Sequence, residues 1–336
     1  MASLTIRRTL KLVGRRFRDF RHVLDFGCGG GRVLRWFDDL QNACTFHGVD
    51  ISQEAINWCK RNIPFAKFTK NDPLPPLPFP GETFDLVYGI SVFTHLDEEY
   101  QDLWLRELQR VTKPEAIVVL TTHGDRKAYM DLTDEEYLRF RSHGFIYKRI
   151  VEQGGVDGLP DFYQVAYHTK DYVERNWSQF FEICSYIRHG PLWHQDLVLM
   201  KKVPRRSRED RPSYTLLDLP IFFLETPRPG ELVFGDEIEV SGWAFYPEGG
   251  QVSIDLRVDE KEFGSCVAEI RRRDVAQDYP KYQSAELSGF ATKLSTETLS
   301  EGYHVLELLA RTNIVPSMVT YFKKGSLTDW QFIPRN

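Results

Sequence analysis

The sequence predicts an α/β domain over residues 1–203, a linker over 204–215 and an all-β domain over 216–336. The length of 336 residues favours two domains, because single hydrophobic cores rarely grow beyond about 250–300 residues. From residue 22 onward, short apolar runs alternate with amphipathic segments, as in a parallel sheet covered by helices. Beyond residue 215, apolar and polar residues alternate in short runs separated by turn signals, which is typical of a β-sandwich.

Local signals define the elements of the first domain. The clearest strands are His22–Phe26, Phe46–Val49, Phe84–Tyr88 and Ile117–Thr121, and a hairpin of Phe181–Ile187 with Leu197–Met200 ends the sheet. Ser52 is suited to cap a helix that runs to Asn62, and Glu98–Val111 carries apolar residues at helical spacing. Thr133 and Glu136 have the spacing of a capping box ahead of a further helix. A glycine-rich turn after the first strand leads into another predicted helix.

The second domain follows a polar, charged and proline-bracketed segment that has nothing to bury, which predicts a linker. The run Val252–Val258 alternates apolar with polar residues, and Gly249–Gly250 is a typical turn signal. This pattern predicts an immunoglobulin-like sandwich. Trp243 and Phe245 lie in one run, either as core aromatics or as part of an exposed binding surface.

Charge and composition exclude several classes of partner. The net charge of −5 and the pI of about 6.0 give no overall attraction for nucleic acid. Arginines and Lys11 crowd into residues 7–21, either as the solvated face of a first helix or as a contact for phosphates or a membrane surface. The sequence contains no run of about 20 apolar residues, so it predicts no membrane span. The five cysteines are widely spaced, which predicts no disulfide framework, no metal site and a reducing, cytoplasmic compartment.

The most informative segment is Val23–Leu34, where a buried strand runs into a turn with glycines at 27, 29, 30 and 31. Glycine allows a sharp turn and a close approach of the backbone to a ligand. Asp50 follows at the end of the second strand, where a carboxylate can accept hydrogen bonds from both ribose hydroxyls of a nucleoside cofactor. Asp25 at the end of the first strand favours a cationic amino-acid group over a pyrophosphate.

The segment Asp25–Gly31 resembles the first motif of class I methyltransferases, and Asn71–Val87 and Ser91–Leu96 match further motifs in the same order. The resemblance implies S-adenosylmethionine as cofactor and a Rossmann-like, seven-stranded sheet whose last strand is reversed. It places the methionine part of the cofactor on Asp25, Gly27, Cys28, Gly29 and Gly31, the ribose on Asp50, the adenine on Ile51 with Asn71 or Asp72, and a further contact on Ile90. Asp72 precedes a proline, so a role as a turn acid stays open.

Residues after the fourth and fifth strands face the acceptor in such a fold, and His95 and His123 occupy these positions. Either histidine suits a general base for a hydroxyl acceptor, and either also suits a hydrogen-bonded loop residue. Tyr163, His168 and His194 are candidate substrate contacts. The alternatives are packing within a small subdomain for Tyr163 and structural roles for the two histidines. The stretches around these two histidines resemble methyltransferases associated with bacterial glycan assembly.

These features predict O-methylation of a sugar, a glycan or a nucleotide-sugar. Two alternatives remain. One is a methyltransferase for a natural-product small molecule, and the other is a non-catalytic protein that binds S-adenosylmethionine and whose β-sandwich is a binding or interaction module. The second domain resembles modules appended to bacterial sugar-modifying enzymes, and self-association through it is a further possibility.

Overall fold

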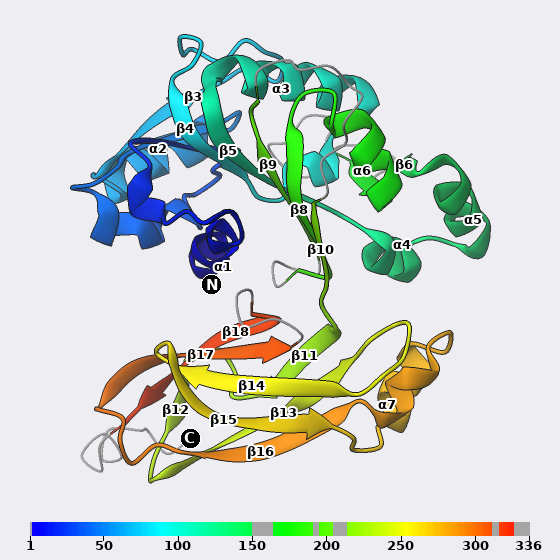
Figure 1. Cartoon of the computed structure of the whole chain (residues 1–336). Helices are drawn as coiled ribbons and strands as arrows, with labels where there is room; N and C mark the ends of the chain where they lie inside the picture. Colours follow the sequence, from blue (N-terminus) through cyan, green and yellow to red (C-terminus); the bar gives the residue numbers. More distant parts are fainter. Residues whose placement is uncertain (1, 150–163, 191–194, 204–213, 311–315, 326–336) are drawn as a thin grey trace. The chain divides into compact units, whose positions relative to one another are not determined.

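The computed structural model describes residues 2–149, 164–190, 195–203, 214–310 and 316–325. The chain divides into two compact units, with the boundary between Leu217 and Asp218. Figure 1 shows an N-terminal unit of helices and sheet and a C-terminal unit made mainly of strands. Each unit is described by itself below.

The N-terminal unit is built on one sheet with the strand order β3-β2-β1-β4-β5-β9-β8-β10. Its strands are β1 (His22–Phe26), β2 (Thr45–Asp50), β3 (Ala66–Lys70), β4 (Phe84–Gly89), β5 (Thr112–Thr122), β8 (Glu182–Arg188), β9 (Asp196–Lys201) and β10 (Thr215–Asp218). The strands β1 to β5 are parallel, and β9 runs antiparallel to both β5 and β8. The order of strands reverses between β1 and β4, and ligands of open α/β sheets bind at the carboxyl ends of the strands at such a point.

The predicted α/β fold and the reversed hairpin at the end of the sheet are confirmed. The prediction of seven strands is wrong by one, because β10 adds an eighth strand beside β8. The first unit consequently extends to residue 217 and not to 203. Most of the predicted linker, residues 204–213, lies outside the described residues.

The helices of this unit are α1 (Ala2–Thr9), α2 (Gln53–Asn62), α3 (Glu98–Val111), α4 (Asp125–Asp131), α5 (Asp134–His143) and α6 (Lys170–Trp177). The caps that the sequence predicts are present, since the Ser52 hydroxyl accepts the Ala55 N–H and Thr133 forms a capping box with Glu136. Helix α3 buries Trp104 and Leu108 in the main core. The helix predicted after the glycine turn is wrong, because this segment forms the 3₁₀ helix η3 (Leu34–Leu40).

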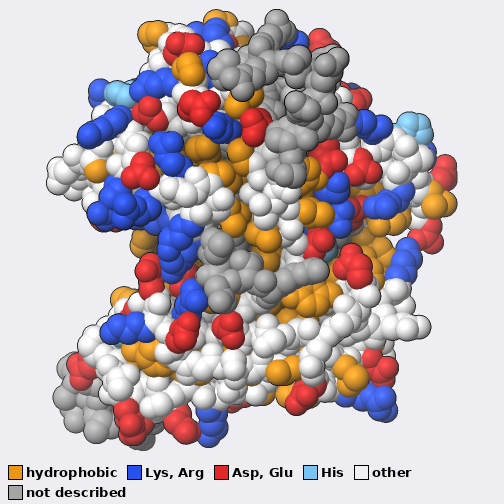
Figure 2. Space-filling view, in the orientation of Figure 1, with side chains coloured by type: hydrophobic (Ala, Val, Ile, Leu, Met, Phe, Trp, Pro, Cys, Tyr) orange, Lys and Arg blue, Asp and Glu red, His pale blue; other side chains and the backbone are white. Residues whose placement is uncertain are grey.

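The basic N-terminal stretch is engaged within its own unit. The Arg7 guanidinium donates to the Asp39 carboxylate at 3.0 Å and lies over the Phe37 ring at 5.1 Å. Arg8 is buried, and Arg15 lies over the Phe20 ring. These contacts favour the interpretation of the stretch as a helix face over a contact for phosphates. Figure 2 shows positive and negative side chains mixed on the visible face. No helix within the described part of the chain is long and apolar enough to cross a membrane.

The C-terminal unit contains a three-stranded sheet, β11-β13-β16, and a five-stranded sheet, β12-β18-β17-β14-β15. The strands are β11 (Ile221–Thr226), β12 (Glu231–Val233), β13 (Glu237–Phe245), β14 (Val252–Val258), β15 (Lys261–Ala268), β16 (Gly289–Ser295), β17 (Gly302–Ala310) and β18 (Met318–Lys324). One hydrophobic core joins both sheets and includes Val240, Ile254 and Phe322, as the alternating pattern predicts for a sandwich. The short helix α7 (Arg273–Asp278) interrupts the predicted all-β chain.

Candidate cofactor and acceptor site

The turn after β1 requires glycine for two separate reasons. Gly27, Gly29 and Gly31 have φ values of +72°, +50° and +66°, and L-residues with side chains rarely adopt this region. A Cβ atom on Gly27 would lie 2.4 Å from Val92 Cγ2, and one on Gly31 would lie 2.3 Å from Ile63 Cδ1. A Cβ atom on Gly29 or Gly30 would meet no heavy atom within 4 Å. The turn is therefore packed on one side and open on the other.

Asp50 connects the end of β2 to this turn. Its Oδ2 accepts the Gly29 N–H at 2.7 Å, and its Oδ1 accepts the Ser52 N–H at 2.8 Å. A carboxylate has about four lone-pair sites, so both oxygens can accept further hydrogen bonds from ribose hydroxyls. Ile51 follows directly and is half-buried, and Ile90 lies buried beyond the end of β4.

Asp25 is a buried carboxyl group with an unused oxygen. The side chain is 3% exposed, and its Oδ2 has no hydrogen-bond partner among the described residues. Its neighbour across the β1–β4 ladder is Tyr88, whose buried hydroxyl interacts with the Asp25 carboxyl group. Burial raises the pKa of Asp25 to about 8, because a carboxylate is poorly solvated there. A buried carboxyl group with one unused oxygen beside an open glycine turn fits the cationic methionine part of S-adenosylmethionine.

Asn71 and Asp72 lie directly after β3. The Asn71 N–H donates to the Asp50 carbonyl at 3.1 Å, so the two strand ends are joined. The Asn71 side chain is buried and donates to the Asp72 carbonyl at 2.7 Å, whereas Asp72 itself is exposed. Of the two, Asn71 is more firmly placed, and the adenine role of each stays a prediction.

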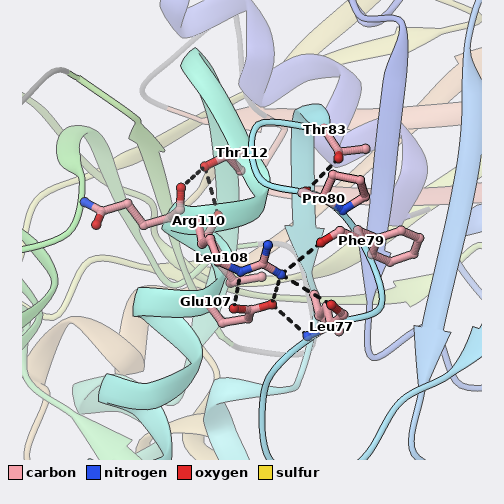
Figure 3. Close-up of polar contacts among 9 residues, drawn as sticks. Leu77, Phe79, Pro80, Thr83, Glu107, Leu108, Arg110 and Thr112 are labelled. Atoms are coloured by element: carbon pink, nitrogen blue, oxygen red, sulfur yellow. Dashed lines mark hydrogen bonds and ion pairs between the residues drawn. The ribbon is translucent and has the colours of Figure 1, made fainter.

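An ion pair on α3 between buried Glu107 and exposed Arg110 holds the proline-rich loop that follows Asp72 (Figure 3). Glu107 Oε1 accepts the Leu77 N–H at 2.7 Å, and Arg110 Nε donates to Glu107 Oε2 at 2.8 Å. Arg110 also donates to the Phe79 carbonyl at 3.0 Å. This pair has no signal in the sequence, because Glu107 and Arg110 at helical spacing look like a solvated surface pair. The structure shows that Glu107 is only 6% exposed.

His95 and His123 lie close together at the carboxyl ends of β4 and β5, with ring centroids 6.2 Å apart. His95 Nδ1 lies 2.7 Å from the Gln164 carbonyl oxygen. Since a carbonyl only accepts, Nδ1 carries the proton and Nε2 keeps the lone pair. Burial lowers the pKa of His95, and it lowers the pKa of His123 to about 4, with a smaller contribution from His95. Both rings are therefore neutral near pH 7.

A strained residue joins the two halves of the site. Ser91, directly after β4, has a φ of +62°, which is unusual for a residue other than glycine and costs about 1–3 kcal/mol. Its N–H donates to Thr121 Oγ1 at 2.8 Å, and its Oγ accepts from Gln195 Nε2 at 2.9 Å. Such strain is concentrated at functional sites. Ser91 begins a motif that the sequence matches, but its positive φ and its hydrogen bond to Gln195 have no local signal in the sequence.

Two of the predicted substrate contacts, Tyr163 and His194, lie outside the described residues. The third, His168, ends β7 (Val165–His168) and is 0% exposed. Its Nε2 lies 2.8 Å from the Gln101 side-chain amide, and its ring contacts Phe145 and Trp177. The predicted role in substrate contact does not fit this position, because the packed aromatic surroundings leave no surface for an acceptor.

The buried carboxyl group of Asp196 explains why the residue after His123 is a glycine, Gly124. Asp196 is fully enclosed, accepts the Tyr186 hydroxyl and the His189 N–H at 2.9 Å each, and has a pKa raised by burial to about 7. A Cβ atom on Gly124 would lie 2.0 Å from Asp196 Oδ2. Gly124 is therefore required by close packing.

We expect Gly124→Ala to lower the free energy of unfolding by about 1–3 kcal/mol, the usual range for overpacking a buried site. The φ of Gly124 is −87°, so backbone strain adds nothing. Urea unfolding measures the loss. Gly81→Ala is the matched control, since its Cβ would come no closer than 3.4 Å to another atom. Equal losses in both variants would contradict the packing explanation.

Within the described ranges, no group of three or more His, Cys, Asp or Glu side chains is placed to hold a metal ion. Comparison with known proteins gives a family match for part of the N-terminal unit. Residues 23–115 match the family described as "Methyltransferase domain".

Three curated relatives are methyltransferases by name, and two of them are O-methyltransferases. A malonyl-[acyl-carrier protein] O-methyltransferase of Halorhodospira halophila is 31% identical over 150 residues, which are 42% of this chain and 50% of the relative. A fatty-acid O-methyltransferase of Mycolicibacterium smegmatis is 33% identical over 96 residues, or 28% and 34% of the two chains. A trans-aconitate 2-methyltransferase of Delftia acidovorans is 36% identical over 70 residues, or 20% and 26%. The chain thus spans half or less of the length of these relatives.

Among solved structures, a methyltransferase of Methanosarcina mazei is 20% identical with a TM-score of 0.41. The match covers 55% of this chain and 93% of that structure's chain. The PH0226 protein of Pyrococcus horikoshii is 20% identical with a TM-score of 0.43, and the match covers 60% of this chain and 90% of that protein's chain. TM-scores below 0.5 do not by themselves establish a shared fold. The family match over residues 23–115, read with the strand order and the glycine turn, shows that the N-terminal unit contains a class I S-adenosylmethionine-dependent methyltransferase domain.

Proposed function

We propose that this protein is an O-methyltransferase that methylates a hydroxyl group of a sugar, a glycan or a nucleotide-sugar. The observation that supports a hydroxyl acceptor is the state of His95, whose ring is neutral near pH 7 and whose Nδ1 donates to the Gln164 carbonyl, so that Nε2 is the basic nitrogen. The sugar class rests on the resemblance of the stretches around His168 and His194 to methyltransferases of glycan assembly.

The bound cofactor supplies an activated methyl group on its sulfonium. In the proposed reaction Asp25 and the glycine turn hold the methionine part, and Asp50 orients the ribose. His95 Nε2 would take up the proton of the acceptor hydroxyl, which would make its oxygen a better nucleophile toward the methyl group that the cofactor would supply. His123 lies beside His95. Its pKa of about 4 makes it the weaker base of the two.

Turnover by His95→Ala tests this proposal. With a hydroxyl acceptor, the variant should lose about 10²–10⁴-fold in kcat, the usual contribution of a general base, while its affinity for S-adenosylhomocysteine stays unchanged. The assay measures release of S-adenosylhomocysteine with methyl glycosides and nucleotide-sugars as acceptors. His123→Ala serves as the comparison and should retain most activity. Unchanged turnover in His95→Ala would remove the base from the mechanism.

A carboxylate acceptor is the second candidate, because malonyl-thioester, fatty-acid and trans-aconitate methyltransferases are among the relatives. A carboxylate is already ionised at neutral pH and needs no base. The same assay with fatty acids and a malonyl thioester separates the two candidates. Activity on these acids that survives His95→Ala would favour the carboxylate over the hydroxyl.

A further inference from the structure

Two cysteines meet at the cofactor turn. Cys28 belongs to the turn itself, and Cys59 lies on α2. The Cys28 side chain is 6% exposed and the Cys59 side chain is 0% exposed. The Cys28 Sγ lies 3.6 Å from the Gly29 carbonyl oxygen, and the Cys59 Sγ lies 3.3 Å from the same oxygen. Elements that are far apart in the sequence therefore bring two thiols to one backbone atom of the turn that binds the cofactor.

The surroundings favour reaction between these two thiols. A hydrogen bond from Cys28 lowers the pKa of the Cys59 thiol, and the thiolate is the reactive form of cysteine. The open side of the turn, at Gly29 and Gly30, leaves room for the turn to move. A small oxidant can reach the pair when the turn opens locally.

We propose that Cys28 and Cys59 form an oxidative modification site, in which a peroxide converts the two thiols to a disulfide that impairs cofactor binding. The Cys59 thiolate attacks the peroxide, which breaks the O–O bond and leaves a sulfenic acid on sulfur and one water. The Cys28 thiol then attacks that sulfur, the S–S bond forms, and a second water leaves with the thiol proton. Two thiols are oxidised and one hydrogen peroxide is reduced.

The disulfide acts on the cofactor through the turn. A bond between the sulfurs replaces their shared contact with the Gly29 carbonyl, so Gly29 must move, and its N–H bond to Asp50 is disturbed with it. Binding and oxidation are then thermodynamically linked. If the disulfide weakens cofactor binding tenfold, the bound cofactor makes the disulfide tenfold harder to form.

The test uses the full chain with Cys44, Cys184 and Cys266 replaced by alanine, so that only the pair remains. Removing Cys44 is necessary because Cys44 and Cys59 share one tryptic peptide. The protein is treated with hydrogen peroxide and digested, and its affinity for S-adenosylhomocysteine is measured by calorimetry before and after treatment. We expect a linked peptide pair containing Cys28 and Cys59, an affinity at least tenfold weaker, and full recovery with dithiothreitol.

Adding Cys59→Ser to the same chain is the control, and its affinity should not respond to peroxide. Saturating S-adenosylhomocysteine should slow formation of the linked peptides in the parent. Wild-type protein, with the linked peptides sequenced by fragmentation, repeats the test should the multiple variant fold poorly. Absence of the linked pair, or a linked pair with unchanged affinity, overturns the proposal. Absence of binding by the reduced protein would instead contradict the cofactor site itself.

Discussion

Gly31→Ala is expected to lower the free energy of unfolding by about 2–5 kcal/mol and to abolish measurable cofactor binding. The left-handed backbone at φ +66° accounts for about 1–2 kcal/mol of this loss. The contact of the new Cβ atom with Ile63 Cδ1 at 2.3 Å accounts for a further 1–3 kcal/mol, roughly the cost of overpacking. Urea unfolding and calorimetric titration with S-adenosylhomocysteine measure the two effects.

The same turn provides graded controls. Gly29→Ala introduces the left-handed strain without a clash, so we expect a loss of about 1–2 kcal/mol. Gly30→Ala introduces neither, and alanine at a compatible position stabilises by about 0.4–1 kcal/mol through the unfolded chain. A loss in Gly30→Ala as large as that in Gly31→Ala would contradict the division of the turn into a packed and an open side.

Cofactor affinity is expected to rise about tenfold per pH unit between pH 6 and pH 7, with one proton released on binding. Asp25 is protonated in the cofactor-free fold, because its pKa is raised by burial to about 8, and a cationic ligand favours the carboxylate. Calorimetry in buffers of different ionisation enthalpy counts the proton directly. Asp25→Asn should bind weakly at all pH values and release no proton from this position.

The ligand's own amino group titrates equally for both proteins, so the difference in slope reports Asp25 alone. A slope that persists in Asp25→Asn would assign the proton elsewhere. Asp25 also affects the cofactor-free fold. Since its folded pKa exceeds the unfolded value of 3.8, the unfolded chain binds fewer protons between about pH 4 and pH 8, and the free energy of unfolding falls as pH rises through that interval.

Local chemistry explains which features the sequence predicts correctly. Ser52 and Thr133 cap helices because their hydroxyls reach backbone N–H groups two or three residues away. Gly27 and Gly31 mark positive φ angles because other residues are penalised there. Asp25 and Asp50 end adjacent strands, as the alternation of strands and helices implies. Each of these features depends on neighbours along the chain or on the order of strands.

Features set by tertiary packing are the ones that the sequence does not reveal. The segment Leu34–Leu40 forms a 3₁₀ helix although its glycine turn is typical of an α-helix start. His168 has the polar side chain of a site residue, and only the packing of α3 and α6 against it shows that it is internal. Ser91 and Gln195 are hydrogen-bonded to each other although they lie 104 positions apart in the sequence, and the Ser91 N–H donates to Thr121 on β5.

The strand β10 has a consequence for dissecting the protein. It follows the charged segment that the composition marks as a boundary, yet it pairs with β8 and forms the outer margin of the first sheet. A domain cut out at residue 203 would therefore expose the backbone N–H and carbonyl groups of β8 as a template for strand addition, with aggregation as the usual outcome. A version of the N-terminal unit that is expressed alone should therefore extend through residue 217.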